Sequence, residues 1–424
     1  KHPTDVDFGC IRDHSQPVLL DFDHAFHPVA AGRRVFFGSS ADDSVRCLSL
    51  DTGQELWSFV TGGPVRFAPH VDGNRLYVGS DDGFVYCLNI IDGEVVWTFR
   101  AAPSERQLVG NQRMISRWPL RSGVLVLDGV VYVTAGMWPA EGVFIYALNA
   151  ATGNVLWVND TSGTLNQPTA NRSAYAITGV APTGYLLAAK KALVVPTGRS
   201  MPASYSQKDG RLLASTAPSY QNRRGGPAVC IDKHGSVIFG TPRERITAGD
   251  YSVLYIYQLP DLTQFGATRG DRILAADRTF MAVNDVIKCV DINSRYTKAT
   301  VKWQQPCPSR QLRCLSLSAN ALLMGIDDRV VARDRATGEL LWEHSGLDGY
   351  AHSIAIADER LLVATDSGSV YCFAAGSVAG GSLRSTPATQ PALQTHPDLQ
   401  TTLKKSGIRR GLALVVGESD TRLA

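Results

Sequence analysis

The phrase Asp51-Thr-Gly-Gln-Glu-Leu-Trp57 recurs along most of this chain and decides its fold. Close copies are Asp92-Gly-Glu-Val-Val-Trp97, Ala151-Thr-Gly-Asn-Val-Leu-Trp157 and Ala336-Thr-Gly-Glu-Leu-Leu-Trp342. Weaker copies are Lys208-Asp-Gly-Arg-Leu-Leu-Ala214, which lacks the tryptophan, and the segment that ends at Trp303, which lacks the glycine. Plain copies follow one another at intervals of about 40 residues, a period typical of propeller blades and solenoid turns.

The residues around each copy predict four short strands. Most copies follow an apolar stretch such as Leu76-Tyr-Val-Gly-Ser-Asp-Asp-Gly-Phe-Val-Tyr-Cys-Leu-Asn89, in which branched and aromatic residues alternate with others. Glycine in the repeated phrase supplies the positive φ that a tight hairpin turn needs, at Gly53, Gly93, Gly153 and Gly338. The outer strand of each unit carries its tryptophan, at Trp57, Trp97, Trp157, Trp303 and Trp342.

The number of units follows from the outer strands, which we place near residues 57, 97, 157, 214, 265, 303 and 342. An eighth unit begins at His352-Ser-Ile-Ala-Ile and stops after Ser369-Val-Tyr-Cys-Phe373, without an outer strand. The isolated strand Val18-Leu-Leu-Asp-Phe22 supplies the missing piece, because pairing the first and last strands removes exposed edges. We therefore predict an all-β, eight-bladed β-propeller over residues 18–374 that is closed by its N-terminal strand.

The two ends of the chain differ from the repeats. Residues 1–17 are irregular, and residues 375–395 are a flexible linker of Ala, Gly, Ser, Thr, Pro and Gln. Residues 396–424 predict a short helix and then the apolar strand Gly411-Leu-Ala-Leu-Val-Val-Gly417. Such a strand needs neighbours to cover both faces, so we expect this stub to be the truncated start of an α/β domain.

Composition and motifs exclude several classes of function. With 42 basic and 39 acidic residues the formal charge is +3, which indicates no nucleic-acid partner. No apolar run reaches the length of about 20 residues that a transmembrane helix needs, and no signal segment follows Lys1. The sequence has no nucleophile motif, Gly-rich phosphate loop or zinc-type spacing, which argues against most hydrolases and nucleotide-dependent enzymes.

The eight cysteines do not indicate a disulfide framework. Four of them occupy one repeat position, where Ala147 and Ala332 stand in other copies, and they are Cys47, Cys87, Cys289 and Cys372. A position shared by Cys and Ala predicts a small, buried site on a strand. Cys307 and Cys314 could form a disulfide or remain free.

The repeat resembles the PQQ-like, or quinoprotein-type, β-propeller repeat over residues 18–374. The resemblance is strongest in the copies at 35–57, 76–97, 131–157 and 322–342. It implies eight blades in which each outer-strand tryptophan docks against the neighbouring blade. It also implies a bacterial protein of the periplasm or another extracytoplasmic space, although the cytoplasm remains an alternative.

Two functional branches share this repeat family. One comprises dehydrogenases that bind pyrroloquinoline quinone (PQQ) and calcium, and the other comprises non-catalytic scaffolds. The dehydrogenases carry a Cys-Cys pair that is absent here, and their calcium ligands and catalytic aspartate find no counterparts in this sequence. We predict no cofactor, with PQQ and calcium as the alternative. The stub at 396–424 resembles the opening of a class I methyltransferase domain.

Acidic and histidine residues near the strand ends have two interpretations. The pairs Asp42-Asp43, Asp81-Asp82 and Asp327-Asp328 could be metal ligands, but they occupy the same turn in separate blades, so we expect turn residues. Three histidines fall at or near the first strand of a blade and could bind a metal or line the channel without chemistry; they are His27, His70 and His352. We predict no metal site.

Insertions between blades carry the best candidate for a binding site. They lie at 101–121, 158–176 and 197–224, with a smaller one at 242–251, and insertions of this kind often map to a binding face. Arginine and aromatic residues concentrate there, a composition typical of binding hot spots. The candidate residues are Arg113, Arg117, Trp118, Arg121, Trp138, Arg199, Arg223 and Arg224.

These observations favour a non-catalytic, monomeric propeller that binds or scaffolds a partner through an Arg/aromatic-rich loop face on blades 3–5. The partner would be a protein or an anionic or carbohydrate ligand. One alternative is an enzyme of the PQQ-dependent dehydrogenase type. A second alternative is a propeller that presents a partner to a fused methyltransferase.

Overall fold

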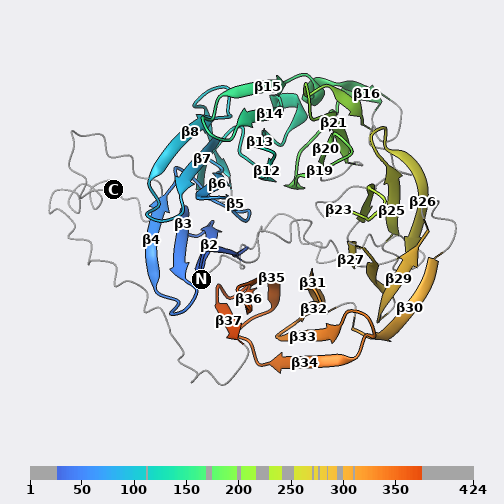
Figure 1. Ribbon diagram of the computed structural model, residues 1–424. Coiled ribbons are helices and arrows are strands. Elements are labelled where there is room, and N and C mark those ends of the chain that lie inside the picture. Colours follow the sequence, from blue (N-terminus) through green and yellow to red (C-terminus); the bar gives the residue numbers. More distant parts are fainter. Residues whose placement is uncertain are drawn as a thin grey trace, which may run out of the picture. The chain divides into compact units, whose positions relative to one another are not determined.

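The computed structural model describes residues 26–374, apart from 111–112, 169–173, 198–201, 216–228, 241–252, 270–271, 276, 284, 294–298 and 309–310. Within this part of the chain, antiparallel sheets follow one another around a ring (Figure 1). The predicted N-terminal segment and closing strand (1–17 and 18–22), linker (375–395) and stub (396–424) lie outside the described residues.

Seven blades have four strands in chain order. The first three are β1 (Val29–Ala31), β2 (Arg34–Ser39), β3 (Ser44–Ser49) and β4 (Glu55–Val60); β5 (His70–Asp72), β6 (Arg75–Gly79), β7 (Phe84–Asn89) and β8 (Val95–Arg100); and β12 (Leu125–Leu127), β13 (Val130–Ala135), β14 (Phe144–Asn149) and β15 (Val155–Asn159). The fourth is β19 (Leu187–Ala189), β20 (Ala192–Val195), β21 (Ala203–Ser206) and β22 (Leu212–Ala214).

The remaining blades complete the ring. They are β23 (Val229–Ile231), β24 (Ser236–Gly240), β25 (Val253–Gln258) and β26 (Thr263–Arg269); β27 (Arg272–Ala275), β28 (Thr279–Val283), β29 (Val286–Ile292) and β30 (Ala299–Pro306); and β31 (Leu312–Leu317), β32 (Ala321–Ile326), β33 (Arg329–Asp334) and β34 (Leu340–Ser345). Blade 8 has three described strands, β35 (Ala351–Ala357), β36 (Arg360–Thr365) and β37 (Val370–Ala374). The prediction of eight blades is confirmed, including the weak blade around Phe265.

Tryptophan docking joins consecutive blades, as the repeat family implies. Trp97 of β8 donates its indole N–H to the Ala150 carbonyl of blade 3 at 3.1 Å, and a Cβ built on Gly153 would lie 2.8 Å from its ring. The same pair of contacts joins Trp57 to blade 2, Trp157 to blade 4 and Trp303 to blade 7. Glycine is needed at these turns both for positive φ and for contact with the ring.

The repeat position shared by Cys and Ala lies opposite the tryptophan. Cys47 pairs with Trp57 and Cys87 with Trp97, and a bulge follows at the next residue. Cys47, Cys87 and Cys289 are fully buried, as predicted. Cys372 is exposed instead, in contrast to the prediction, and it lies in β37, the outermost described strand of blade 8. Cys307 and Cys314 do not form the possible disulfide with each other.

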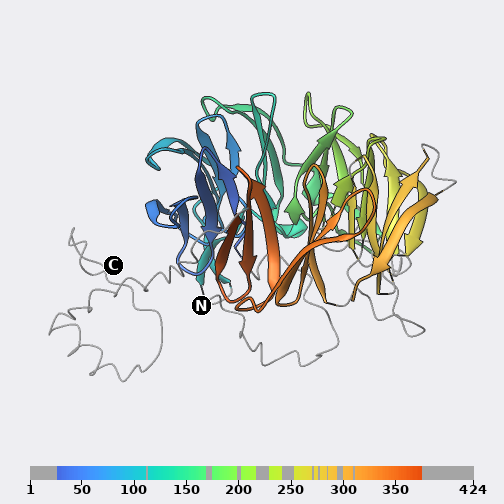
Figure 2. The same cartoon turned by 60° about the horizontal axis from the view of Figure 1, so that its bottom comes forward.

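The hydrophobic core is divided into clusters that lie between neighbouring blades. One cluster joins Tyr77 and Cys87 of blade 2 to Val131 and Leu148 of blade 3. The junction of blades 8 and 1 is marked by Phe26, whose ring packs on Phe37, 4.9 Å between centroids. The first strand of each blade lies toward the centre of the ring, and the tryptophan-bearing strands lie at the circumference (Figures 1 and 2).

The docking glycines give a direct test of these inter-blade contacts. Gly153 and Gly129 have the same φ of +74°, but a Cβ on Gly129 would meet nothing within 4 Å. Gly129→Ala should cost about 1 kcal/mol of unfolding free energy through backbone strain. Gly153→Ala should cost about 1–3 kcal/mol more, because its methyl group would displace the Trp97 ring. Chemical denaturation measures both, and equal losses would contradict the docking role.

Candidate functional site

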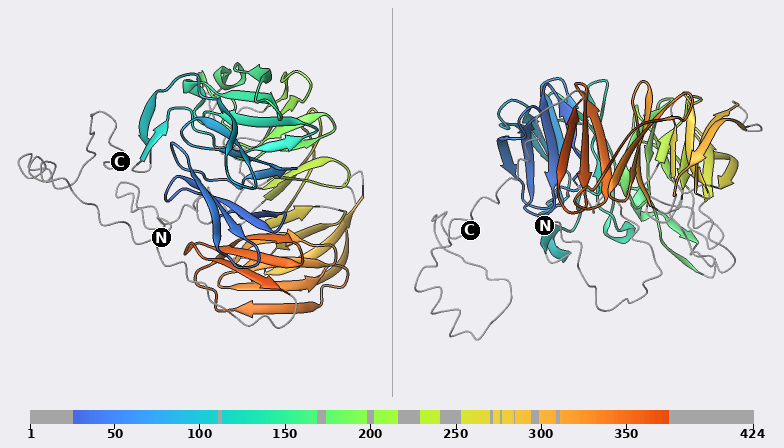
Figure 3. Two further views of the ribbon diagram at one scale, coloured as in Figure 1. Left: turned by 60° about the vertical axis from the view of Figure 1, so that its left-hand side comes forward. Right: turned by 90° about the horizontal axis from the view of Figure 1, so that it is seen from below.

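The insertions emerge on one face of the ring. In a four-stranded antiparallel blade, the turn between the second and third strands lies on the same side as the link from the fourth strand to the next blade. The hairpin of β9 (Gln107–Gly110) and β10 (Arg113–Ser116) lies in the link from β8 to β12, and that of β16 (Asn166–Pro168) and β17 (Tyr175–Ile177) in the link from β15 to β19. Figure 3 shows these segments on one side of the propeller, here called the insertion face.

A buried ion-pair network anchors the first insertion. Asp81, in the turn between β6 and β7, is fully buried. Its two carboxylate oxygens lie 2.7 Å from Nε of Arg66 and 3.0 Å from Nε of Arg121, and both arginine side chains are also buried. The backbone takes part as well, since Ser116 donates its N–H to the Asp81 carbonyl at 2.7 Å. Asp81 is a turn residue, as predicted, but it is also the centre of a network that joins two arginines.

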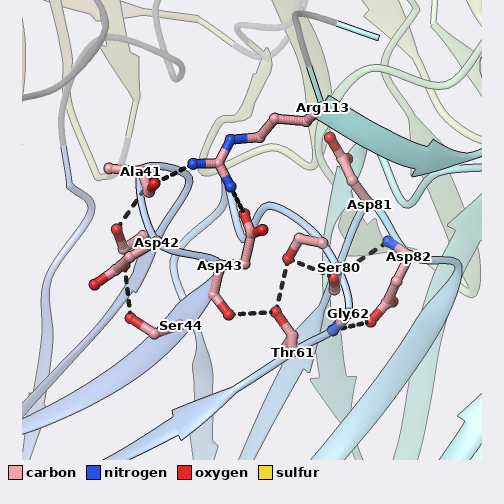
Figure 4. Close-up of polar contacts among 12 residues, drawn as sticks. Ala41, Asp42, Asp43, Ser44, Thr61, Gly62, Ser80, Asp81, Asp82 and Arg113 are labelled. Atoms are coloured by element: carbon pink, nitrogen blue, oxygen red, sulfur yellow. Dashed lines mark hydrogen bonds and ion pairs between the residues drawn. The ribbon is translucent and has the colours of Figure 1, made fainter. Parts of the chain in front are cut away.

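The hairpin also reaches blade 1. Figure 4 shows Arg113 beside the turn between β2 and β3, where its Nη1 lies 2.6 Å from Oδ1 of Asp43 and its other terminal nitrogen donates to the Ala41 carbonyl. Burial raises the pKa of Asp43, and the ion pair with Arg113 opposes that shift. Burial also raises the pKa of Asp82, although Tyr86 donates its hydroxyl to it at 2.6 Å. The hairpin is thus held over blades 1 and 2.

A loop of blade 3 forms the middle of the insertion face. This loop, residues 136–143 between β13 and β14, contains the short 3-10 helix η2 (Pro139–Glu141). Arg117 forms an ion pair with Glu141, and the buried Trp118 donates its indole N–H to the Glu141 carbonyl at 2.7 Å. The helix η2 packs against η3 (Ser162–Thr164) of the second insertion. The first hairpin, the loop and the second insertion are therefore contiguous.

Apolar side chains are exposed along these connected segments. Val109 is 70% exposed, Trp138 42% and Tyr175 71%, and Met114 and Ile177 are also exposed. Val109 and Met114 are cross-strand neighbours and therefore share one face of their hairpin. We call the set Val109, Met114, Trp138, Tyr175 and Ile177 the apolar patch.

Tyr185 contacts the segments that lead into the first strands of blades 1 to 4. It lies in β18 (Gly184–Tyr185), just before β19, and β18 pairs in parallel with β11 (Ser122–Gly123), just before β12. Its hydroxyl accepts the N–H of Ala68, before β5, at 3.0 Å. Its ring lies 5.2 Å from that of Phe67 and 6.2 Å from that of His27, before β1. Desolvation of its hydroxyl raises the pKa of Tyr185, although the residue as a whole is 37% exposed.

Comparison with known proteins identifies the family. Residues 20–117 and 41–252 match the family described as outer membrane protein assembly factor BamB, and together they cover more than half of the chain. This chain belongs to that family. Outer membrane protein assembly factor BamB of Yersinia pestis is 22% identical to this BamB-family chain over 378 residues, which span 75% of this chain and 88% of the relative.

Solved structures share the fold of this BamB-family chain. The computationally designed protein Ika8 is 16% identical and has a TM-score of 0.54, with 83% of this chain and 96% of that chain covered. Quinohemoprotein alcohol dehydrogenase from Comamonas testosteroni is 11% identical and has a TM-score of 0.53, with 80% of this chain and 69% of that chain covered. At these identities the likeness concerns the fold alone.

The structure brings together most of the predicted site residues that it describes. Arg113, Arg117, Trp118, Arg121 and Trp138 gather on the link from blade 2 to blade 3 and on the adjoining loop. The described part of the site thus lies over blades 1 to 3, whereas the prediction named blades 3–5, because the hairpin folds back on the preceding blades. Arg199, Arg223 and Arg224 lie outside the described residues. The sequence analysis missed Arg66, the ion pairs of Asp81 with two arginines, and the exposed apolar residues of the two hairpins.

Among the described residues, no three His, Cys, Asp or Glu side chains are grouped as a metal site requires. His70 begins β5 and His352 lies in β35, both first strands of their blades. Burial lowers the pKa of His70. None of the described helices is long and apolar enough to cross a membrane.

Two arginines of the first insertion should differ sharply in their contribution to stability. Arg121→Met removes a buried partner of Asp81 and should cost about 3 kcal/mol of unfolding free energy, because it leaves a buried carboxylate incompletely compensated. Arg117→Met breaks a half-exposed pair with Glu141 and should cost less than about 1 kcal/mol. Urea denaturation of both variants measures the difference. Equal losses would show that Arg121 does not anchor the insertion.

Proposed function

We propose that this chain is a non-catalytic scaffold of outer-membrane protein assembly that works in an extracytoplasmic compartment and docks a partner protein on its insertion face. Membership of the BamB family supports the role and the compartment, because the relatives are named as outer membrane protein assembly factors. The apolar patch supports the place of docking. It is the observation that carries the proposal.

The composition of this surface suits a protein partner. Interface hot spots favour tryptophan, tyrosine and arginine, and exposed apolar clusters with a polar rim mark interaction sites. Trp138 and Tyr175 supply the aromatic anchors, and Arg117 lies beside the buried Trp118, its Cζ atom 5.6 Å from the ring centre. The arginine is already paired with Glu141, so it favours a protein surface over a strongly charged small anion.

The surface is also pre-organised. Asp81, Arg66 and Arg121 fix the base of the first hairpin from inside the protein, and Arg113 fixes its far end to blade 1. A surface that is ordered before binding loses less conformational entropy on association. The same contacts explain how a short hairpin can hold the side chains of Val109 and Met114 in a fixed position on the insertion face.

The test is capture of partners from solubilised cell envelopes of the native organism, after cross-linking in cells and with quantitative mass spectrometry. The wild-type chain should enrich proteins of outer-membrane assembly. The double variant Met114→Asp with Trp138→Ser should lose that enrichment by more than about tenfold, since it places a charge in the apolar patch and removes one of the two aromatic anchors.

The matched control is Ile91→Asp. Ile91 is an apolar residue, 54% exposed, in the turn between β7 and β8 on the opposite face. This variant should capture the same proteins as the wild type. The proposal fails if the double variant keeps its partners, or if the control loses them to the same extent.

A further inference from the structure

The first hairpin has one strand edge with unused backbone groups. In the β9–β10 pair, Ser116 lies opposite Gln107 and Met114 lies opposite Val109. Ser116 donates its N–H to the Asp81 carbonyl, so this N–H points away from β9. In an antiparallel pair, opposite residues either both point their backbone groups inward or both point them outward, and the two kinds alternate. Gln107 and Val109 therefore turn their N–H and C=O groups to the outer edge of β9.

This edge lacks the usual protection against pairing. Natural edge strands carry charges, proline or bulges that prevent the addition of another strand. The four residues of β9, Gln107-Leu-Val-Gly110, include no charge and no proline, and their register with β10 is regular. Within the part of the chain that the structure describes, no further backbone group bonds to Gln107 or Val109. Both residues are exposed to solvent.

We propose that the partner adds an extended strand to the outer edge of β9. This inference rests on the proposed function, because it specifies how the partner uses the insertion face. Strand addition gains affinity from main-chain hydrogen bonds and specificity from alternate side chains. The added side chain beside Val109 continues the apolar row that Val109 and Met114 begin.

One arginine beside β9 indicates the chemistry of the added strand. The insertion's other arginines have acidic partners, since Arg100 pairs with Glu105, Arg113 with Asp43, Arg117 with Glu141 and Arg121 with Asp81. Arg106, next to β9, is exposed and forms no ion pair with any residue that the structure describes. The partner strand is therefore apolar at alternate positions and acidic where it passes Arg106. A second copy of this chain would bring the same arginines to the interface, which disfavours self-pairing.

Val109→Pro tests the inference on the full chain. Proline removes the outward N–H of Val109 but no bond of the β9–β10 ladder, because that N–H lies outside the ladder. Val109→Ala is the matched control, since it shortens the side chain and keeps the N–H. The probe is the acetylated and amidated peptide Asp-Val-Thr-Val-Thr-Val-Asp, measured by isothermal titration calorimetry. The proline variant should bind it about tenfold more weakly than the alanine variant.

A second measurement keeps the test independent of folding in the proline variant. Two N-methylated versions of the same peptide are titrated into the wild type, one methylated at the odd-numbered amides and the other at the even-numbered amides. One version should bind about tenfold more weakly than the unmodified peptide and the other should not, because only one edge of the peptide faces β9. Replacing the aspartates by lysines should also weaken binding.

The inference is overturned if the two Val109 variants bind the peptide equally, if both N-methylated versions bind equally, or if the wild type does not bind it. Wild-type dimers that Val109→Pro dissolves would overturn it in favour of a second copy. The proposed function is judged separately, because it depends on partner capture by the Met114 and Trp138 variant. Loss of capture there, with equal peptide binding by the Val109 variants, keeps the docking face and excludes strand addition.

Discussion

The docking of a tryptophan on the glycine turn of the next blade is the contact that holds together four pairs of neighbouring blades. The indole N–H donates to a backbone carbonyl, and the ring covers a turn where a Cβ has no room, as with Trp97 and Gly153. One contact thus satisfies a polar group and brings neighbouring sheets together along their outer strands. Between those sheets lie the buried clusters that stabilise the fold. Each blade is therefore held by its neighbours, as in other repeat architectures.

A regular ring presents similar surfaces all round, so a specific site requires a departure from the repeat. Here the departure is the pair of hairpins on the insertion face. Buried ion pairs hold the first of these hairpins in place. Burying Asp81 is favourable only because Arg66 and Arg121 compensate its carboxylate from two directions. Because Arg121 must lie beside Asp81, the end of the first insertion is held against blade 2. The apolar residues at its tip, including Val109, remain exposed because no described segment folds over them.

Sequence reasoning succeeded where the signal was local and repeated. The strands around Trp57 and Trp97, the glycine turns and the buried position of Cys47 and Cys87 all follow from alternation and turn chemistry. It was wrong at one repeat position. Cys372 shares the position of Cys47, yet it is exposed. The described arginines of the predicted face also contact blades 1 and 2, because the hairpin of the first insertion folds back over the preceding blades.

The sequence by itself determined the number of blades, their strand order and the glycines on which the tryptophans dock. Those features depend on the two-residue period of strands and on a repeat of nearly constant length, both of which are visible along the chain. Only the tertiary structure decided the roles of the arginines. Arg117 and Arg121 look alike in sequence, but one pairs with Glu141 at the surface and the other with buried Asp81. The reason is physical: an ion pair depends on distance in space, and the folding of the insertion over blades 1 to 3 sets that distance.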